Sequence, residues 1–233
     1  MQRSNDRLSP ARRSFLSRLG SGFVAVGAAL GAQPATALAQ APASGGVWHP
    51  ARHAEDDWFD KIPGKHRTFL DAVSAHGVGE ALHFASNIFT TSKSGYGLES
   101  GEVAIVVCLR HGATAFAFND AMWTKFGEHM SAQTKFTDPK TQAAPTKNLY
   151  NSAEFRRGDA TFDSLIKLGV HFAVCDKSTQ GLSGNLARKT EGKADAVYNE
   201  LIANVIGNGH MVPSGIVAVG HAQERGYAYA YCG

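Results

Sequence analysis

The chain has 233 residues and a formal net charge of +3, and 43% of its residues are hydrophobic. Residues 1–39 contain five Arg and one Asp, so residues 40–233 carry 18 basic and 19 acidic residues and a net charge of −1. The main part of the chain therefore lacks the excess positive charge that binding to nucleic acid or to an anionic membrane requires. Its length suits one domain with a sizeable hydrophobic core.

The N-terminal segment has the features of an export signal. Arg12-Arg13 is followed by Phe15-Leu16, an apolar run extends over 22–38, and Ala37-Leu38-Ala39 has the small residues of a cleavage site. We predict that residues 1–39 are a twin-arginine signal peptide, that the twin-arginine translocase delivers the folded protein to the periplasm, and that no stable membrane anchor remains. An arginine pair in a general secretory signal or an anchor is the alternative, but the Gly, Ala and Thr in the run favour a cleaved signal.

After the signal, we interpret residues 40–63 as an N-terminal arm that packs on the domain or on a neighbouring subunit, and residues 64–233 as one domain. Short apolar runs predict strands at 65–71, 103–109, 170–175, 210–212 and 227–232, and the run at 103–109 is continuous and β-branched. Apolar residues at helical spacing predict helices at 77–91, 119–130, 160–168, 195–205 and 214–225. Residues 131–158 are polar and contain two prolines, which predicts a long loop. This alternation predicts an α/β fold with a mostly parallel sheet and helices on both of its faces.

The three cysteines, Cys108, Cys175 and Cys232, are each predicted to lie at the carboxyl end of a strand, so we expect the thiols along one edge of the sheet. Cys175 is the candidate catalytic residue, because the polar sequence after it suits entry into a helix, and a helix N-terminus favours a reactive thiolate. The alternative is that Cys175 is a small buried apolar residue, as free cysteines often are.

Polar residues follow the strand at 103–109. Arg110 could hold an anion, and His111 could titrate or bind a ligand, since both come directly after a central strand. Asn119, at the start of the next predicted helix, is the third candidate for ligand binding. Structural hydrogen bonding is the alternative for Arg110 and His111. The ten histidines form no CxxCH pattern, and the spacing of the cysteines matches no zinc signature, so we predict no metal site and no cofactor.

Several segments together resemble the DsrE/DsrF-like superfamily, and in particular its exported branch with twin-arginine signals. The resemblance covers residues 65–232 and is carried by the segments 106–113, 118–123, 169–175, 212–217 and 223–227. It implies a three-layer α/β fold with a five-stranded, mostly parallel sheet, and homo-oligomers such as trimers or hexamers. In sulfur-relay members a cysteine accepts sulfur as a persulfide, and Cys175 is the position that matches it. This chain differs from those members in its export signal, its arm and its longer loop.

Three functions remain open from the sequence. The first is sulfur or redox chemistry at Cys175, with Arg110 and His111 lining a crevice for a small sulfur-containing or anionic ligand. The second is a non-catalytic module of the periplasm that binds a small ligand or serves as an oligomeric scaffold. The third is metal or haem binding through His111 and a cysteine. Whether the protein is an enzyme depends on which of these is correct.

Overall fold

The computed structural model describes residues 48–152, 155 and 160–233, and within it His49–Gly233 forms one compact unit. The predicted signal peptide, with Arg12, Arg13, Phe15 and Leu16, lies outside the described residues, as does the first part of the arm.

A single sheet of five strands runs through this unit, and every neighbouring pair of strands is parallel. The spatial order is β4-β3-β2-β1-β5. The strands are β1 (His66–Ala72), β2 (Val103–Leu109), β3 (His171–Cys175), β4 (Gly209–Val212) and β5 (Ala228–Cys232). The predicted strands are therefore all present, with ends that differ by no more than one residue, and the sheet is wholly rather than mostly parallel.

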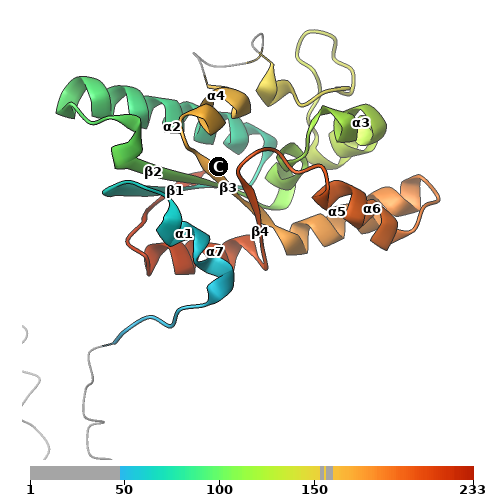
Figure 1. Ribbon diagram of the computed structural model, residues 1–233. Helices are drawn as coiled ribbons and strands as arrows, with labels where there is room; N and C mark the ends of the chain where they lie inside the picture. The colour runs from blue at the N-terminus through green and yellow to red at the C-terminus, as the bar shows by residue number, and fades with distance from the viewer. Residues whose placement is uncertain (1–47, 153–154, 156–159) are drawn as a thin grey trace, which may run out of the picture. The chain divides into compact units, whose positions relative to one another are not determined.

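Helices cover both faces of the sheet (Figure 1). One face carries α2 (Ala75–Tyr96), α3 (Asp120–Thr134), α4 (Phe162–Lys167), α5 (Asp176–Lys189) and α6 (Ala194–Ile202). The other face carries α1 (Trp58–Lys61) and α7 (Gly215–Gln223). Short 3-10 segments complete the chain at Ala54–Asp56, Ser100–Glu102, His111–Ala117 and Leu149–Asn151. The result is the three-layer α/β architecture that the alternation of strands and helices predicts.

Strand β2 explains why the core divides into two layers. All seven of its residues are buried. Ile105, Val107 and Leu109 belong to the larger cluster beneath α2 and α3, whereas Val106 and Cys108 belong to the smaller cluster beneath α7. Because side chains alternate along a strand, a continuous apolar run is what a central strand with two covered faces requires.

Two helix termini show how local sequence fixes the longest helix. The Ser74 side chain caps α2 by accepting a hydrogen bond from the Gly77 amide at 2.9 Å. At the other end Gly97 has a φ of 68° and stops the helix in the left-handed conformation. Helix α2 therefore extends beyond the predicted range 77–91 at both ends.

The described part of the arm packs on the α7 face of the domain. Phe59 is completely buried, and its carbonyl oxygen accepts hydrogen bonds from the Arg67 guanidinium at 2.9 Å and from the Tyr227 hydroxyl at 2.8 Å. Asp56 pairs with His221 and Asp60 with Arg225, both on or next to α7. Residues 54–62 thus form part of the compact unit rather than a separate extension.

The arm also contacts a pair of histidines on the neighbouring strands β3 and β4. The indole of Trp58 stacks on the ring of His210, with centroids 4.0 Å apart and planes at 5°. His210 Nε2 lies 2.9 Å from Nδ1 of His171 on the neighbouring strand, so the two rings share one hydrogen bond. Burial, together with the neighbouring His171, lowers the pKa of His210 to about 4, and burial lowers the pKa of His171.

Candidate functional site

The carboxyl ends of the three central strands bring polar side chains together on the α7 face. Strand register places Asp71 of β1 directly opposite Cys108 of β2, and Cys108 opposite Ala173 of β3. Cys175 lies two residues beyond Ala173 and therefore on the same face. Asp71, Cys108 and Cys175 form what we call the strand-end site, together with Arg110 on the loop after β2.

Cys175 ends β3 and is the residue immediately before the first turn of α5. Only 4% of its surface is exposed. The Ser178 hydroxyl lies 3.3 Å from Cys175 Sγ and donates to it, while the Ser178 oxygen accepts a hydrogen bond from the His111 backbone amide at 3.0 Å. A hydroxyl donor and a helix N-terminus both stabilise negative charge on the sulfur. Cys175 therefore combines a hydrogen-bonded sulfur with a position at the N-terminus of a helix.

His111 contributes through its backbone rather than its ring. The residue has a φ of 52°, in the left-handed region that non-glycine residues rarely adopt. Its amide is donated to Ser178, and its side chain is exposed. The sequence singled out His111 for its imidazole, whereas the structure connects it to Cys175 through the main chain.

Arg110 is held by a buried carboxylate. Its Nε and Nη2 donate to the two oxygens of Asp71, each at 2.8 Å, and Asp71 is completely buried. The hydrogen bond to Asp71 raises the pKa of Arg110, which keeps its guanidinium charged. The Tyr229 hydroxyl of β5 donates to the same carboxylate at 3.0 Å. Among the described residues, no hydrogen bond engages Nη1 of Arg110, which leaves its two N–H groups for a ligand.

Cys108, the middle residue of the site, lies next to the start of α7. It is fully buried, and Sγ would be only 3.0 Å from a Cβ placed on Gly215, the first residue of α7. Burial, followed by the charge of Asp71, raises the pKa of Cys108 well above its ordinary value, although Arg110 opposes the shift. Neighbouring parallel strands offset by two residues put the Cα atoms of Cys108 and Cys175 about 8 Å apart. A direct disulfide would therefore require the backbone to move, and both thiols are free.

Cys232 lies on the opposite face of the sheet. It pairs with Ala72 in the register of β1 and β5, and its side chain belongs to the core beneath α2. Burial raises its pKa to about 11. The sequence placed all three thiols along one edge, and only Cys108 and Cys175 share a face there.

Asn119 caps a helix and lines a separate cavity. Its side-chain oxygen accepts hydrogen bonds from the amides of Ala121 and Met122, and its nitrogen donates to Asn204. The cavity has a volume of about 480 Å³, and its lining includes Asp120 and Asp163 but not Cys175, Arg110 or His111. Asn119 is thus brought to a different part of the fold from the other three candidates.

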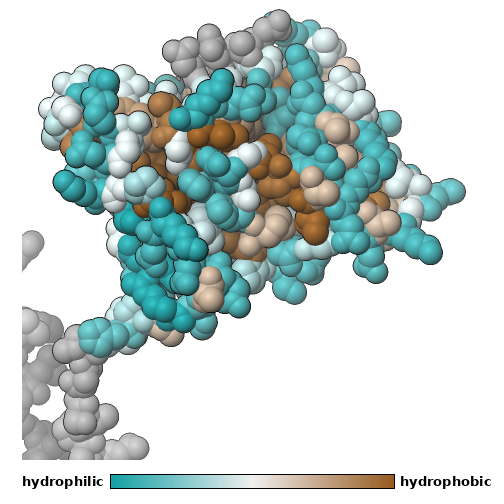
Figure 2. All heavy atoms as spheres, viewed as in Figure 1, coloured by the Kyte–Doolittle hydropathy of each residue, from teal (hydrophilic) through white to brown (hydrophobic). Residues whose placement is uncertain are grey.

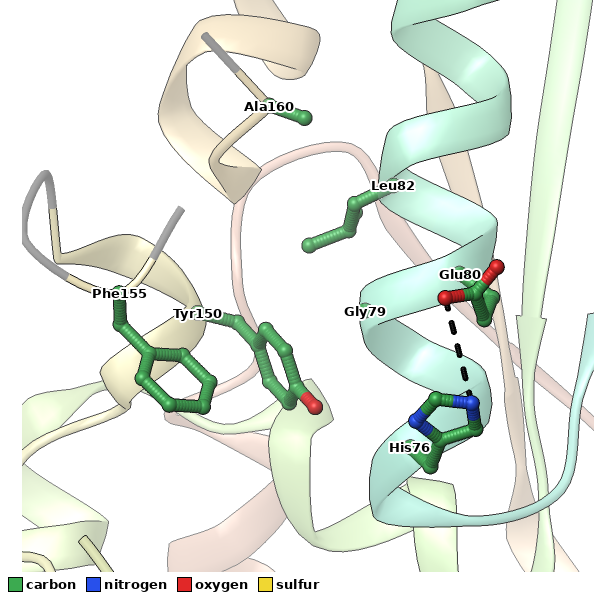
Figure 3. A pocket seen from close by; sticks show the side chains of 7 residues that line it. All are labelled: His76, Gly79, Glu80, Leu82, Tyr150, Phe155 and Ala160. Atoms are coloured by element: carbon green, nitrogen blue, oxygen red, sulfur yellow. Dashed lines mark ion pairs between the residues drawn. The ribbon is translucent and has the colours of Figure 1, made fainter. Parts of the chain in front are cut away.

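A smaller cavity of about 180 Å³ lies between α2 and the segment that follows Asn148. Figure 3 shows His76 and Glu80 on one side of α2, with the rings of Tyr150 and Phe155 facing the helix. The Tyr150 hydroxyl donates to the Ala75 carbonyl oxygen at 2.5 Å, and burial raises the pKa of Tyr150 to about 12. Tyr150 is therefore a neutral phenol whose hydroxyl is used in a hydrogen bond to the backbone.

The sequence interpretation did not single out several residues of the strand-end site, namely Asp71, Ser178, Gly215 and Tyr229. An acidic residue directly after the apolar pair Phe69-Leu70 in a predicted strand was the available signal for Asp71, because a carboxylate buried there needs a partner. Ser178 lies three residues after Cys175, the separation at which a side chain reaches back over the first helical turn. Gly215 and Tyr229 reach the site only through the packing of α7 and β5.

Two further properties concern the part of the chain that the structure describes. No three His, Cys, Asp or Glu side chains are grouped there so that they could share a metal ion. None of the helices there combines the length and the apolar character needed to cross a bilayer.

Figure 2 shows apolar residues in the middle of the visible face, between more polar outer parts of the domain.

Fold and site together define the class of protein: an open, all-parallel α/β domain with a hydrogen-bonded cysteine at the carboxyl end of a central strand. No family model matches the chain, and no curated protein matches it. Among solved structures, a protein of unknown function from Methanobacterium thermoautotrophicum is similar over 72% of this chain and 99% of its own length, with 14% identity and a TM-score of 0.37.

Proposed function

We propose that this is an exported, DsrE-like protein that accepts sulfur or redox equivalents at Cys175. The observation that supports the proposal most directly is the pair of hydrogen bonds that ends on the thiol, from the His111 amide to Ser178 and from the Ser178 hydroxyl to Cys175 Sγ. A buried cysteine that acts only as an apolar residue does not require a donor aimed at its sulfur.

The proposed step is attack by the Cys175 thiolate on the outer sulfur of a persulfide or polysulfide. A bond forms between Cys175 Sγ and that sulfur, and the sulfur–sulfur bond of the donor breaks. The donor leaves as a thiolate or a shortened polysulfide with the electron pair of that bond, and Cys175 becomes a persulfide. The free Nη1 of Arg110 would bind an anionic donor, with its guanidinium held in place by Asp71.

The cellular setting is part of the proposal. We infer that the twin-arginine translocase exports the folded protein to the periplasm and that it works there as a homo-oligomer. In an oxidising compartment a free thiol is exposed to disulfide formation. Cys175 is buried, and its position on β3 is too far from Cys108 for a disulfide without backbone movement. Both features would help the thiol to stay reduced in that compartment.

A second candidate is a non-catalytic module that binds a small ligand or acts as a scaffold. The specific observation in its favour is the 4% exposure of Cys175, which limits direct access by a donor. Under this hypothesis Ser178 and Arg110 only stabilise the strand ends.

The experiment that separates the two candidates measures sulfur addition. The purified protein is incubated with polysulfide, and its intact mass is compared with that of Cys175→Ser and, as a matched control, Cys232→Ser. We expect the wild type and Cys232→Ser to gain the mass of one sulfur atom and Cys175→Ser to gain none. Sulfur retained by Cys175→Ser, or no gain in the wild type, would favour the binding module.

Iodoacetamide labelling tests the contribution of Ser178. Loss of one hydrogen bond, about 1 kcal/mol, should slow labelling of Cys175 near neutral pH about fivefold in Ser178→Ala. Ser183→Ala removes another hydroxyl of α5, one that bonds to the Gln180 carbonyl, and should leave the rate unchanged. Equal rates in the wild type and Ser178→Ala would show that the hydrogen bond does not activate the thiol.

A further inference from the structure

Cys108 is a second nucleophilic group in the strand-end site, and the step proposed for Cys175 does not use it. Cys108 is fully buried, and its Sγ lies 3.9 Å from the carbonyl oxygen of Gly215, the first residue of α7. A sulfur donor in solution therefore has no direct access to it. Cys175 is the thiol that shares its face of the sheet, because Cys232 lies on the opposite face.

The spacing of these two thiols is too long for a disulfide and suits a bridge with one more sulfur atom. Cys108 lies opposite Ala173 in the register of β2 and β3, and Cys175 is two residues further along β3. With strands about 4.8 Å apart and a rise of about 3.3 Å per residue, the two Cα atoms are about 8 Å apart. A disulfide spans roughly 4.4–6.8 Å between Cα atoms, and an inserted sulfur extends that range by about 1 Å, to nearly 8 Å.

The surroundings of the two thiols separate their roles. Cys175 Sγ accepts a hydrogen bond from the Ser178 hydroxyl at the N-terminus of α5. Burial, then the charge of Asp71, then the neighbouring Cys175 raise the pKa of Cys108 well above its ordinary value. The effect of Cys175 on this pKa also shows that the two sulfur atoms are within electrostatic reach of each other. Cys108 is therefore a protonated thiol that reacts after Cys175 has taken up sulfur.

We propose that sulfur accepted by Cys175 becomes the central atom of a trisulfide between Cys175 and Cys108, so that the strand-end site stores sulfur in a closed bridge. This inference rests on the proposed acceptance of sulfur at Cys175. A persulfide has a free outer sulfur, which an oxidising compartment can oxidise further. A buried trisulfide has no free sulfur terminus and protects its cargo from that loss.

The bridge forms in two steps, and polysulfide is the only co-reactant. In the first, the Cys175 persulfide attacks the outer sulfur of a second polysulfide and gains one sulfur atom, while the shortened polysulfide leaves with the electron pair of the broken bond. In the second, Cys108 Sγ attacks the sulfur bonded to Cys175 Sγ, and the bond between the two added sulfur atoms breaks. The outer sulfur leaves with that electron pair. It receives the proton of the Cys108 thiol by way of Asp71, which lies opposite Cys108 in the strand register, and departs as hydrosulfide.

Thiol labelling of the full chain tests the proposal. The protein is loaded with polysulfide, freed of excess reagent, unfolded in urea without reductant and labelled with N-ethylmaleimide. All three cysteines are free before loading, so the unloaded protein should take three labels. A trisulfide leaves a single label, at Cys232, whereas a persulfide at Cys175 still allows three labels because its outer sulfur is alkylated.

Peptide mapping of the loaded wild type identifies the bridge without any substitution. Digestion without reductant should recover the Cys108 and Cys175 peptides joined through one additional sulfur atom. Dithiothreitol should separate them and release one sulfide per chain. Diamide oxidises thiols but supplies no sulfur, and we expect it to give no direct disulfide between these two cysteines. Such a disulfide would contradict the spacing on which the trisulfide depends.

Two variants separate this inference from the proposed function. Cys108→Ala should add sulfur at Cys175 and keep both of its remaining labels, because the persulfide cannot be closed. Cys232→Ser, the matched control, should form the bridge and take no label after loading. A loaded wild type that carries added sulfur and still takes three labels would overturn the trisulfide and leave sulfur acceptance at Cys175 intact. A wild type that gains no sulfur would overturn both.

Discussion

At the scale of the residue, the strand-end site depends on the close approach of the α7 backbone to the side chains of Arg110 and Cys108. Arg110 and Cys108 contact the first turn of α7 at Gly215, where a Cβ would lie 2.8 Å from the Arg110 Cβ and 3.0 Å from Cys108 Sγ. A glycine at this position lets α7 begin directly over the site. The absence of a side chain there is therefore as important for the site as the cysteine itself.

Gly215→Ala should destabilise the protein. The added methyl group has no space between Arg110 and Cys108, and overpacking of this kind costs about 1–3 kcal/mol. Gly220→Ala in the same helix meets nothing within 4 Å and should stabilise by up to ~1 kcal/mol, because alanine favours a helix. Urea unfolding of the two variants measures the difference. Equal stability of the two variants would contradict the close packing at Gly215.

At the scale of the element, the arm is attached to the domain by two kinds of contact. Asp56 pairs with His221 and Asp60 pairs with Arg225, and Trp58 stacks on His210. His210 and His171 share a hydrogen bond beneath Trp58, and a charge on either ring is disfavoured there. The histidine pair is thus the part of the arm contact that acid weakens.

We expect stability to fall as the pH decreases from about 6.5 to about 4. The folded state lowers the pKa of His210 to about 4, so its contribution is complete above the unfolded value near 6.5 and is lost as the pH falls towards 4. Because the ring is only half-buried, the loss should be about 1–2 kcal/mol.

Urea unfolding across this pH range, with Trp58 fluorescence as a probe of the arm, measures the effect. His210→Phe keeps an aromatic ring beneath Trp58 but cannot be protonated, so its stability should depend less on pH. His49→Gln changes an exposed histidine and should behave like the wild type. A pH dependence that is the same in His210→Phe and the wild type would assign the loss to other groups.

At the scale of the whole molecule, the sheet has two edge strands, and β5 carries large side chains that the domain does not cover. Tyr229 and Tyr231 are 42% and 57% exposed and lie on the same face of β5. Exposed aromatic residues beside an unpaired strand edge are typical of an interface between proteins. This observation supports the proposed homo-oligomer.

The proposed assembly predicts that sedimentation equilibrium gives a trimer or hexamer for the wild type. A charge in the middle of the proposed interface costs desolvation energy, so Tyr231→Asp should shift the protein towards the monomer. Tyr96→Asp changes a tyrosine that is 82% exposed at the end of α2 and should not change the assembly. A monomeric wild type would contradict the prediction.

Much of the fold was predictable because it depends on local patterns. The run at 103–109 is apolar at every position, and it forms β2 with those same ends. The polar sequence after Cys175 suggested the start of a helix. It did not predict the length of α5, because most residues of that helix are polar and give only a weak apolar pattern. Helix α6 ends at Ile202 rather than Val205, because Val205 instead pairs with Phe118 in an isolated bridge.

The candidate site was less predictable, because its contacts join residues far apart in the sequence. The sequence by itself determined that Cys108, Cys175 and Arg110 lie at strand ends, since hydrophobic periodicity sets where strands stop. Only the tertiary structure decided that Cys232 faces the other side, that Asp71 holds Arg110 and that Ser178 donates to Cys175. The physical reason is register: a shift of one residue moves a side chain to the opposite face of a sheet, and no local pattern specifies the register between distant strands.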